Sequence, residues 1–183
     1  MIKPMLAYKY KEAKVDWNEK VYIQPKLDGV RCLISKDGAY SRTGKEFKNI
    51  EHIKKMLKHF FKACPWAILD GELYNHELKD DFEKIISLVR KQKPTDEDRA
   101  EAHKMIQYHV YDYIHEGDEG GLSYANRLDN LTTSDIYCWS IQHVPARLVK
   151  NKDKAQRVHL AQLEAGYEGS ILRTDTPYKH GRS

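Results

Sequence analysis

Short runs of apolar and β-branched residues alternate along the chain with longer stretches in which apolar residues recur every three or four positions. The short runs predict strands at residues 21–23, 31–35, 39–41, 67–69, 105–114 and 168–173. Asp-Gly pairs at Asp28-Gly29 and Asp37-Gly38 separate the first three runs and favour tight turns between neighbouring strands.

The longer stretches predict helices. Between residues 50 and 63, one helical face carries Ile53, Met56, Leu57, Phe60 and Phe61. Asn49 is the expected N-cap of this helix, and Pro65 ends it. A second helix is expected at 81–91, where the inner face carries Phe82, Ile85, Ile86 and Val89. Asp80 and Glu83 resemble a capping box at its start.

The second half of the chain predicts two more helices. Ser123 is placed to cap a short helix that carries Tyr124, Leu128 and Leu131 inward. A helix at 151–165 ends at Gly166, the residue type expected just past a helix C-terminus. Residues 91–101 are polar and predict a loop with a frayed helix, and 117–121 predict a flexible acidic loop.

These elements define a fold class. Strands outnumber helices and tight turns join neighbours, so the pattern predicts mostly antiparallel sheets with helices packed outside, an α+β class. The 183 residues suit one domain, 1–183, with a sizeable core. The composition, 40% hydrophobic and 32% charged, is ordinary for a soluble protein and argues against disorder.

Composition excludes several function classes. No apolar run approaches a membrane span and no signal-peptide core follows the first residues, so we expect a cytoplasmic protein. Cys32, Cys64 and Cys138 lie far apart and are expected to be reduced thiols. The nine histidines show no metal-ligand spacing, so no zinc site is predicted.

The net charge of +4 permits a polyanionic partner without requiring one. Much of the positive charge lies in residues 3–20 and 45–62. These blocks could flank a phosphate backbone, or they could be solvated helix faces; charge alone favours the solvated faces.

One hexapeptide, Lys26-Leu27-Asp28-Gly29-Val30-Arg31, carries the most chemistry. A lysine at a strand edge, followed by Asp-Gly and an arginine, suits the placement of an amine beside phosphate oxygens, because Arg31 offers a fork of donors. A neutral Lys26 is a nucleophile of the kind used in covalent lysyl intermediates. The alternative is a plain β-hairpin whose turn carries two solvated basic residues, and this fragment alone leaves the two alternatives balanced.

Four further segments of the chain favour a nucleotide site over a plain β-hairpin at the hexapeptide. The hexapeptide resembles the nucleotidyl-lysine motif of ATP-dependent DNA ligases and, more widely, of RNA ligases and mRNA capping enzymes. Three later motifs of that family resemble the segments at residues 41–47, 68–73 and 168–173, and its aromatic-Asp motif resembles residues 108–113. Five motifs in order identify the chain as similar to the adenylation (nucleotidyltransferase) domain of this family. The resemblance implies two mostly antiparallel sheets that enclose a nucleotide cleft.

The resemblance also implies a reaction. Lys26 would attack the α-phosphate of ATP, release pyrophosphate and form lysyl-AMP; the AMP would pass to a DNA 5′-phosphate before nick sealing. Transfers of this kind depend on positioning and charge neutralisation, so Mg²⁺ is implied. By motif match, Glu72 and Glu168 are the expected metal-side carboxylates, and Glu72 also suits the ribose. The same match places Arg31 and Arg42 on the sugar and phosphates and Tyr111 on the base.

The chain departs from the family pattern in two places. Where many members carry a glutamate that accepts from the adenine amine, this chain has Gln24, whose amide could serve adenine or guanine. The chain stops at Ser183, after Tyr178-Lys179-His180-Gly181-Arg182, before a lysine-rich fifth motif and an oligonucleotide-binding (OB) barrel. The expectation is therefore a C-terminally incomplete adenylation domain that binds ATP or AMP, labels itself slowly and seals no nicks.

The favoured function is that of an ATP-dependent DNA ligase that acts on nicked double-stranded DNA. We expect a monomer that does not associate with a membrane. Its expected location is the cytoplasm, at the nucleoid, or in the host cytoplasm for a viral protein. An RNA ligase or a GTP-using capping nucleotidyltransferase is the alternative enzyme. An inactive nucleotide- or nucleic-acid-binding module that kept the motifs is the alternative outside the enzymes.

Overall fold

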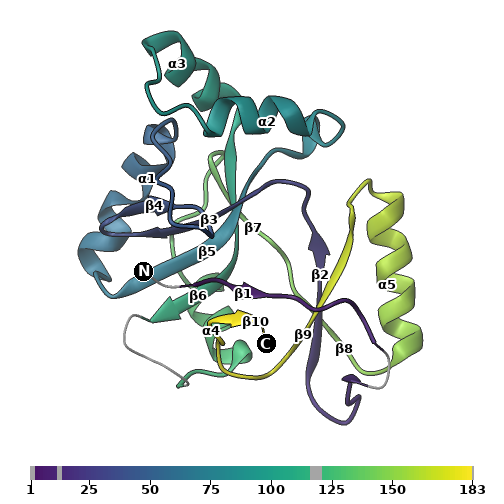
Figure 1. Ribbon diagram of the computed structural model, residues 1–183. Helices are drawn as coiled ribbons and strands as arrows, with labels where there is room; N and C mark the ends of the chain where they lie inside the picture. The colour runs from purple at the N-terminus through teal and green to yellow at the C-terminus, as the bar shows by residue number, and fades with distance from the viewer. Residues whose placement is uncertain (1–2, 12–13, 116–120, 183) are drawn as a thin grey trace.

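The computed structural model describes residues 3–11, 14–115 and 121–182. Two β-sheets form the body of the molecule (Figure 1). The larger has the strand order β4-β3-β5-β6-β7 and the smaller has the order β8-β2-β9, while β1 and β10 form a separate pair. The strands are β1 Met5–Leu6, β2 Val21–Lys26, β3 Val30–Ser35, β4 Gly38–Tyr40, β5 Ala67–Tyr74, β6 Gln107–His115, β7 Ile141–His143, β8 Arg147–Val149, β9 Gly169–Thr174 and β10 Gly181–Arg182.

Helices cover the sheets from outside. They are α1 Glu51–Ala63, α2 Phe82–Val89, α3 Asp96–Met105, α4 Tyr124–Thr132 and α5 Lys152–Glu164. In Figure 1, α1, α2 and α3 lie on the side of the larger sheet and α5 lies beside the smaller one. Most strand pairs are antiparallel, although β6–β7 and β1–β10 are parallel. The predicted α+β class with mostly antiparallel sheets is confirmed.

Each sheet has its own core. The main cluster joins α1 and α2 to the larger sheet through buried residues such as Ile53, Leu57, Leu69 and Ile85. A smaller cluster, with Val21, Ile23 and Val158 among its members, packs α5 against the smaller sheet. Because β2 belongs to one sheet and β3 to the other, the segment between them crosses from sheet to sheet. The hairpin alternative for Asp28-Gly29 is therefore wrong.

The start and inner face of the first helix differ from the prediction. Ile50 is the N-cap of α1 and makes no side-chain cap bond. Asn49 is buried, and its amide nitrogen donates to the carbonyls of Leu88 (3.0 Å) and Asp98 (3.2 Å). Asn49 thus ties α1 to α2 and α3. Met56 is 54% exposed and does not belong to the inner face.

The polar stretch after α2 is better ordered than predicted. Residues 91–101 include the first part of α3, a regular helix that begins with a capping box between Thr95 and Asp98. The expected cap of α2 is also displaced by one residue, because the side chain of Asp81, and not that of Asp80, accepts from Lys84 N (3.1 Å). The charged composition concealed this helix, which buries only Ala102 and whose start is marked by the capping box.

The helices of the second half start where predicted. Ser123 accepts from Asn126 N at the start of α4, and Asn151 accepts from Lys154 N at the start of α5. Gly166 follows α5 with a positive φ of 88°. In α4, Tyr124 and Leu131 are buried, whereas Leu128 is only partly buried and Arg127 is buried in its place. The acidic loop predicted at 117–121 falls almost entirely outside the described residues.

We expect acid to destabilise the protein through His109. This side chain lies on β6, its Nε2 is 3.0 Å from Gln107 Oε1, and its ring packs edge-on against Tyr74. Burial, with a smaller effect of His76, lowers the pKa of His109 to about 4. Below about pH 6.5 His109 is protonated in the unfolded chain but stays neutral in the folded one. The free energy of unfolding therefore falls as the pH drops from 6.5 to 4. The loss from this residue at pH 4.5 is about 2–3 kcal/mol.

The measurement is urea unfolding at pH 7 and pH 4.5. The variant His109→Gln should lose less free energy of unfolding between these pH values than the wild type does. His59→Gln, a change at an exposed position of α1, is the control and should follow the wild type. Equal losses for wild type and His109→Gln would contradict the assignment.

Candidate active site

Lys26 lies at the end of β2, where it faces Gly169 at the start of β9. Its Nζ forms an ion pair with Glu168 Oε1. The two side chains are 42% and 44% exposed, so the pair is open to solvent on the rim of the site. Two residues that are far apart in sequence, both predicted from motifs, therefore meet directly.

Gly29 allows the chain to pass closely over β5 on its way from β2 to β3. A Cβ at this position would lie 2.6 Å from both Glu72 Cγ and the Leu73 carbonyl oxygen. Gly29 is not among the glycines with a positive φ, so the motif needs glycine here for space rather than for a left-handed backbone.

The segment 41–47 is a tight loop after β4. Ser41 Oγ accepts from Lys45 N (3.0 Å), and Gly44 has a positive φ of 84°. Phe47 anchors the end of the loop in the main core. These bonds hold the exposed Arg42 at the mouth of the cleft that contains Lys26.

Asp70 organises one wall of the cleft. It is fully buried, and it accepts from Arg31 Nε and Nη2 (2.6 Å each) and from the Tyr178 hydroxyl (2.6 Å). The guanidinium of Arg31 also donates to the carbonyl of Met5 (2.9 Å). Arg31 lines the cleft, but its main charge partner is protein. The sequence motif contained Asp70 without indicating this role.

Glu72 and Tyr111 lie side by side behind this ion pair. The Tyr111 hydroxyl is 3.3 Å from Glu72 Oε2. Burial raises the pKa of Glu72 to about 8, although the neighbouring Arg31 and Lys26 oppose the shift. The guanidinium carbons of Arg31 and Arg173 lie 4.9 Å and 5.3 Å from the centre of the Tyr111 ring. Tyr111 is therefore largely covered by protein, with 9% of its surface exposed, and it lines the cleft.

A second buried carboxylate, Asp112, joins the two sheets. It lies on β6 and accepts from both Arg127 of α4 (2.8 and 3.2 Å) and Arg173 of β9 (2.7 Å). The side chains of Asp112 and Arg127 are 0% and 3% exposed. Asp112 and Arg173 belong to predicted motifs without an assigned role, whereas no local pattern singled out Arg127.

Gln24 lies two residues before Lys26 and is buried. Its Nε2 donates to the carbonyl oxygen of Val144 (3.1 Å). This bond orients the amide and engages one of the two N–H groups of its nitrogen.

All seven residues expected at the site line one cavity of about 1330 Å³. They are Gln24, Lys26, Arg31, Arg42, Glu72, Tyr111 and Glu168. Other lining residues were not expected; these are Trp17 and Arg173, part of the basic segment near the N-terminus (Lys9, Lys11 and Lys14), and one face of α5 (Lys152, Ala155, Gln156 and His159). Helical spacing could have placed the α5 residues on one face of the helix. It could not have shown that this face points into the cavity.

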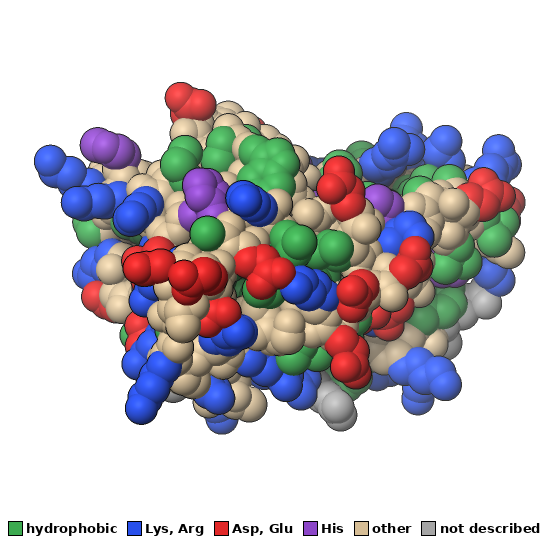
Figure 2. All heavy atoms as spheres, turned by 90° about the horizontal axis from the view of Figure 1, so that it is seen from above, with side chains coloured by type: hydrophobic (Ala, Val, Ile, Leu, Met, Phe, Trp, Pro, Cys, Tyr) green, Lys and Arg blue, Asp and Glu red, His purple; other side chains and the backbone are tan. Residues whose placement is uncertain are grey.

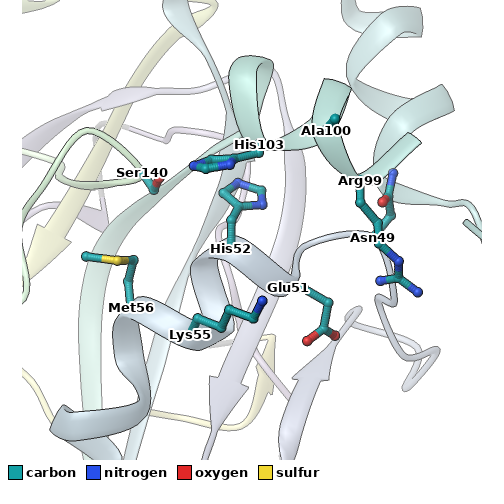
Figure 3. A pocket seen from close by; sticks show the side chains of 9 residues that line it. All are labelled: Asn49, Glu51, His52, Lys55, Met56, Arg99, Ala100, His103 and Ser140. Carbon is teal, nitrogen blue, oxygen red and sulfur yellow. The ribbon is translucent and has the colours of Figure 1, made fainter. Parts of the chain in front are cut away.

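A second, smaller cavity lies between α1 and α3 (Figure 3). Its volume is about 340 Å³, and it holds none of the residues expected at the site. The rings of His52 and His103 stack there at 5.2 Å, and His52 Nε2 is 2.9 Å from the carbonyl oxygen of Ile106. Since His52 serves the packing of these helices, we assign no chemistry to this cavity.

The face of the molecule shown in Figure 2 is not uniformly basic. Figure 2 views the molecule from the side of α2 and α3, where Asp and Glu side chains cross the middle and Lys and Arg gather at the edges. Among the described helices, none combines the length and hydropathy needed to cross a bilayer.

Solved structures share this fold. The DNA ligase–adenylate of Chlorella virus superposes with a TM-score of 0.73 at 21% identity, over 100% of this chain and 63% of that one. The ATP-dependent DNA ligase of bacteriophage T7, solved with ATP, gives a TM-score of 0.73 at 19% identity, over 99% of this chain and 66% of that one. The two-sheet arrangement of this chain is therefore the fold of those DNA ligase structures.

Sequence comparison gives the family. The model of the ATP dependent DNA ligase domain matches residues 4–183, and the chain belongs to this family. The DNA ligase of African swine fever virus is 31% identical over 169 residues, which are 87% of this chain and 38% of that protein. The chain therefore spans less than half the length of these curated relatives.

Proposed function

We propose that this domain transfers AMP from ATP to nicked duplex DNA through a covalent lysyl-AMP on Lys26. The observation that carries the proposal is the contact of Lys26 with Glu168 inside a cavity that also holds the five other expected residues. The bond formed joins Lys26 Nζ to the α-phosphorus, and the bond broken releases pyrophosphate. The 5′-phosphate at a nick then takes the AMP from the lysine.

The ion pair has a consequence for the first step. An amine bonded to a carboxylate as an ion pair is an ammonium group, which is not a nucleophile. Lys26 must therefore lose a proton, to the carboxylate of Glu168 or to solvent, before it attacks the α-phosphorus. The exposure of both side chains leaves room for this proton transfer.

The donor set fits Mg²⁺, which prefers carboxylate and phosphate oxygens. Glu168 offers an exposed carboxylate beside the reacting amine, and Glu72 offers a second one deeper in the cavity. Burial favours the protonated form of Glu72, so we propose Glu168 as the principal protein ligand. When bound, Mg²⁺ would neutralise charge on the phosphates of ATP.

Adenine is the base that the site suits best. Because Val144 engages the amide nitrogen of Gln24, the amide oxygen is the better placed atom to meet a base, and it can accept from the adenine amine. Arg42 at the mouth suits the phosphates. The contacts of Arg31 with Asp70 and Met5 suggest that it positions the wall of the cleft as well as the sugar.

The direct test is incubation with ATP or GTP labelled at the α-phosphate, followed by a denaturing gel. We expect a covalent label from ATP that depends on Mg²⁺ and not from GTP. Labelling by GTP alone would favour the capping-enzyme alternative, and no label from either nucleotide would contradict the proposal. Transfer of the labelled AMP to the 5′-phosphate of nicked DNA compared with nicked RNA then tests the choice of strand.

Tyr111 gives a second prediction. If its ring supports the base, Tyr111→Ala should weaken ATP binding by about 1–3 kcal/mol, the range for loss of one base–aromatic contact. Tyr111→Phe is the matched control, because it keeps the ring and removes only the bond to Glu72. Calorimetric titration of folded variants measures both. Equal weakening by Ala and Phe would assign the effect to the hydroxyl instead.

A further inference from the structure

The segment Pro4–Lys11, here called the N-terminal arm, is fixed to the wall of the cleft. Its strand β1 pairs with β10, and Met5 N donates to the Tyr178 hydroxyl (2.7 Å). Met5 O accepts from Arg31 (2.9 Å). Since Tyr178 and Arg31 are both bonded to Asp70, the start of the arm is held by the same buried carboxylate that organises the cleft.

Beyond this anchor, the arm exposes an alternating pattern of aromatic and basic side chains. Tyr8 and Tyr10 are each 54% exposed, and Lys9 and Lys11 between and after them are also exposed. The amine of Lys14 lies 5.2 Å from the centre of the Tyr8 ring. Residues 3–11 contain three lysines and no carboxylate.

This pattern lies at the reaction site and not on a remote surface. The whole segment from Met5 to Lys11 lines the cavity that contains Lys26. In Figure 1 the arm runs from β1 past β2 towards α5. Whatever binds the arm is therefore placed next to the nucleotide on Lys26.

Aromatic rings interleaved with lysines match the chemistry of a nucleic-acid strand. Lysines neutralise successive phosphates, and exposed rings provide faces on which bases or sugars pack. An acidic protein would match the lysines but would give the two tyrosines nothing in particular to contact. Resting on the proposed function, we propose that Tyr8–Lys11 of the N-terminal arm binds the DNA strand whose 5′-phosphate receives AMP.

The test separates DNA binding from reaction with ATP. One double variant, Lys9→Ala/Lys11→Ala, removes charge, and another, Tyr8→Ala/Tyr10→Ala, removes the rings. Fluorescence anisotropy measures binding of a labelled nicked duplex with a 5′-phosphate at several salt concentrations. Labelling by ATP is measured on the same preparations.

The two variants should fail in different ways. Loss of both lysines should reduce affinity about tenfold at low salt and lower the slope of log K against log salt by about 2, since each phosphate contact contributes about 0.9. Loss of both tyrosines should reduce affinity by roughly thirtyfold or more with the slope unchanged, since each base–aromatic contact contributes at least about fivefold. Labelling of Lys26 by ATP should stay within about twofold of wild type.

Matched controls lie elsewhere on the surface. Lys58→Ala/Lys62→Ala removes two exposed charges from α1, and Trp139→Ala removes a ring that is 49% exposed. Both should bind DNA like the wild type. Poly-glutamate of equal charge should displace the duplex from the wild type far less well than unlabelled DNA does.

Each of the following results would overturn the inference: wild-type affinity in both arm variants, an equal loss in the controls, no binding of nicked duplex by the wild type, or displacement by poly-glutamate as effective as by DNA. Parallel loss of ATP labelling and DNA binding would assign the arm to the nucleotide instead, and would overturn it too. Failure of the proposed function is separate, because it appears as absence of labelling in the wild-type protein.

Discussion

Replacement of Lys26 by alanine should abolish the covalent label from ATP, with a loss of at least several hundredfold in the amount of lysyl-AMP. The reason is that, in the proposed reaction, the amine of Lys26 forms the bond to phosphorus, and no positioning effect can replace it. Lys26 lies at the end of β2, opposite Gly169, and its amine contacts Glu168. Quantitative labelling followed by peptide mapping measures the effect.

Lys26→Arg should not restore the label, because a guanidinium stays protonated and is a poor nucleophile. Lys36→Ala is the control, since Lys36 is exposed in the turn between β3 and β4, and it should label like the wild type. An adduct mapped to Lys36 or Lys45 would show that the nucleophile has been misassigned.

The second large effect is on stability: Asp112→Asn should lower the free energy of unfolding by about 3–5 kcal/mol. The change leaves the buried guanidiniums of Arg127 and Arg173 without a negative partner. A domain of this size is typically stable by about 5–15 kcal/mol, so the variant should be close to unfolding at 37 °C. Urea unfolding at constant pH provides the measurement.

Asp129→Asn is a suitable control, because Asp129 is an exposed carboxylate on the same helix as Arg127. It should change the free energy of unfolding by less than about 0.5 kcal/mol. A similarly small effect of Asp112→Asn would mean that water or rearrangement compensates the two arginines, and that Asp112 does not hold the sheets together.

The candidate site was inferred from signals that are local in the sequence. Each motif is a few residues long and carries its chemistry in a fixed spacing, as in the segment from Lys26 to Arg31. The family resemblance, and no spacing rule, brought Lys26 and Glu168 together. The contact of their side chains in the structure agrees with that expectation.

Long-range pairing could not be predicted in the same way. An Asp-Gly pair between two apolar runs indicates a hairpin, yet β2 and β3 belong to different sheets because their partners come from distant parts of the chain. Periodicity also overestimated the inner face of α1 by including Met56. It missed α3, where only the Thr95–Asp98 capping box marked the start of a helix.

Buried charge was the other source of error. Arginine is usually exposed, so nothing in the sequence distinguished Arg127 from the surface arginines around it. Its burial depends on a carboxylate on another strand, Asp112, and that pairing is visible only in three dimensions.

The strand order has a consequence for how the chain is made. Among the described strands, β2 pairs with β8 and β9, which begin at Arg147 and Gly169, whereas β3 finds its partners β4 and β5 before residue 75. During synthesis on the ribosome, both edges of β2 therefore stay unpaired while the first strands of the larger sheet assemble. Such an unpaired apolar strand is a site for wrong association. Chaperone contacts with the nascent chain should accordingly concentrate on Val21–Lys26 and end when β9 emerges.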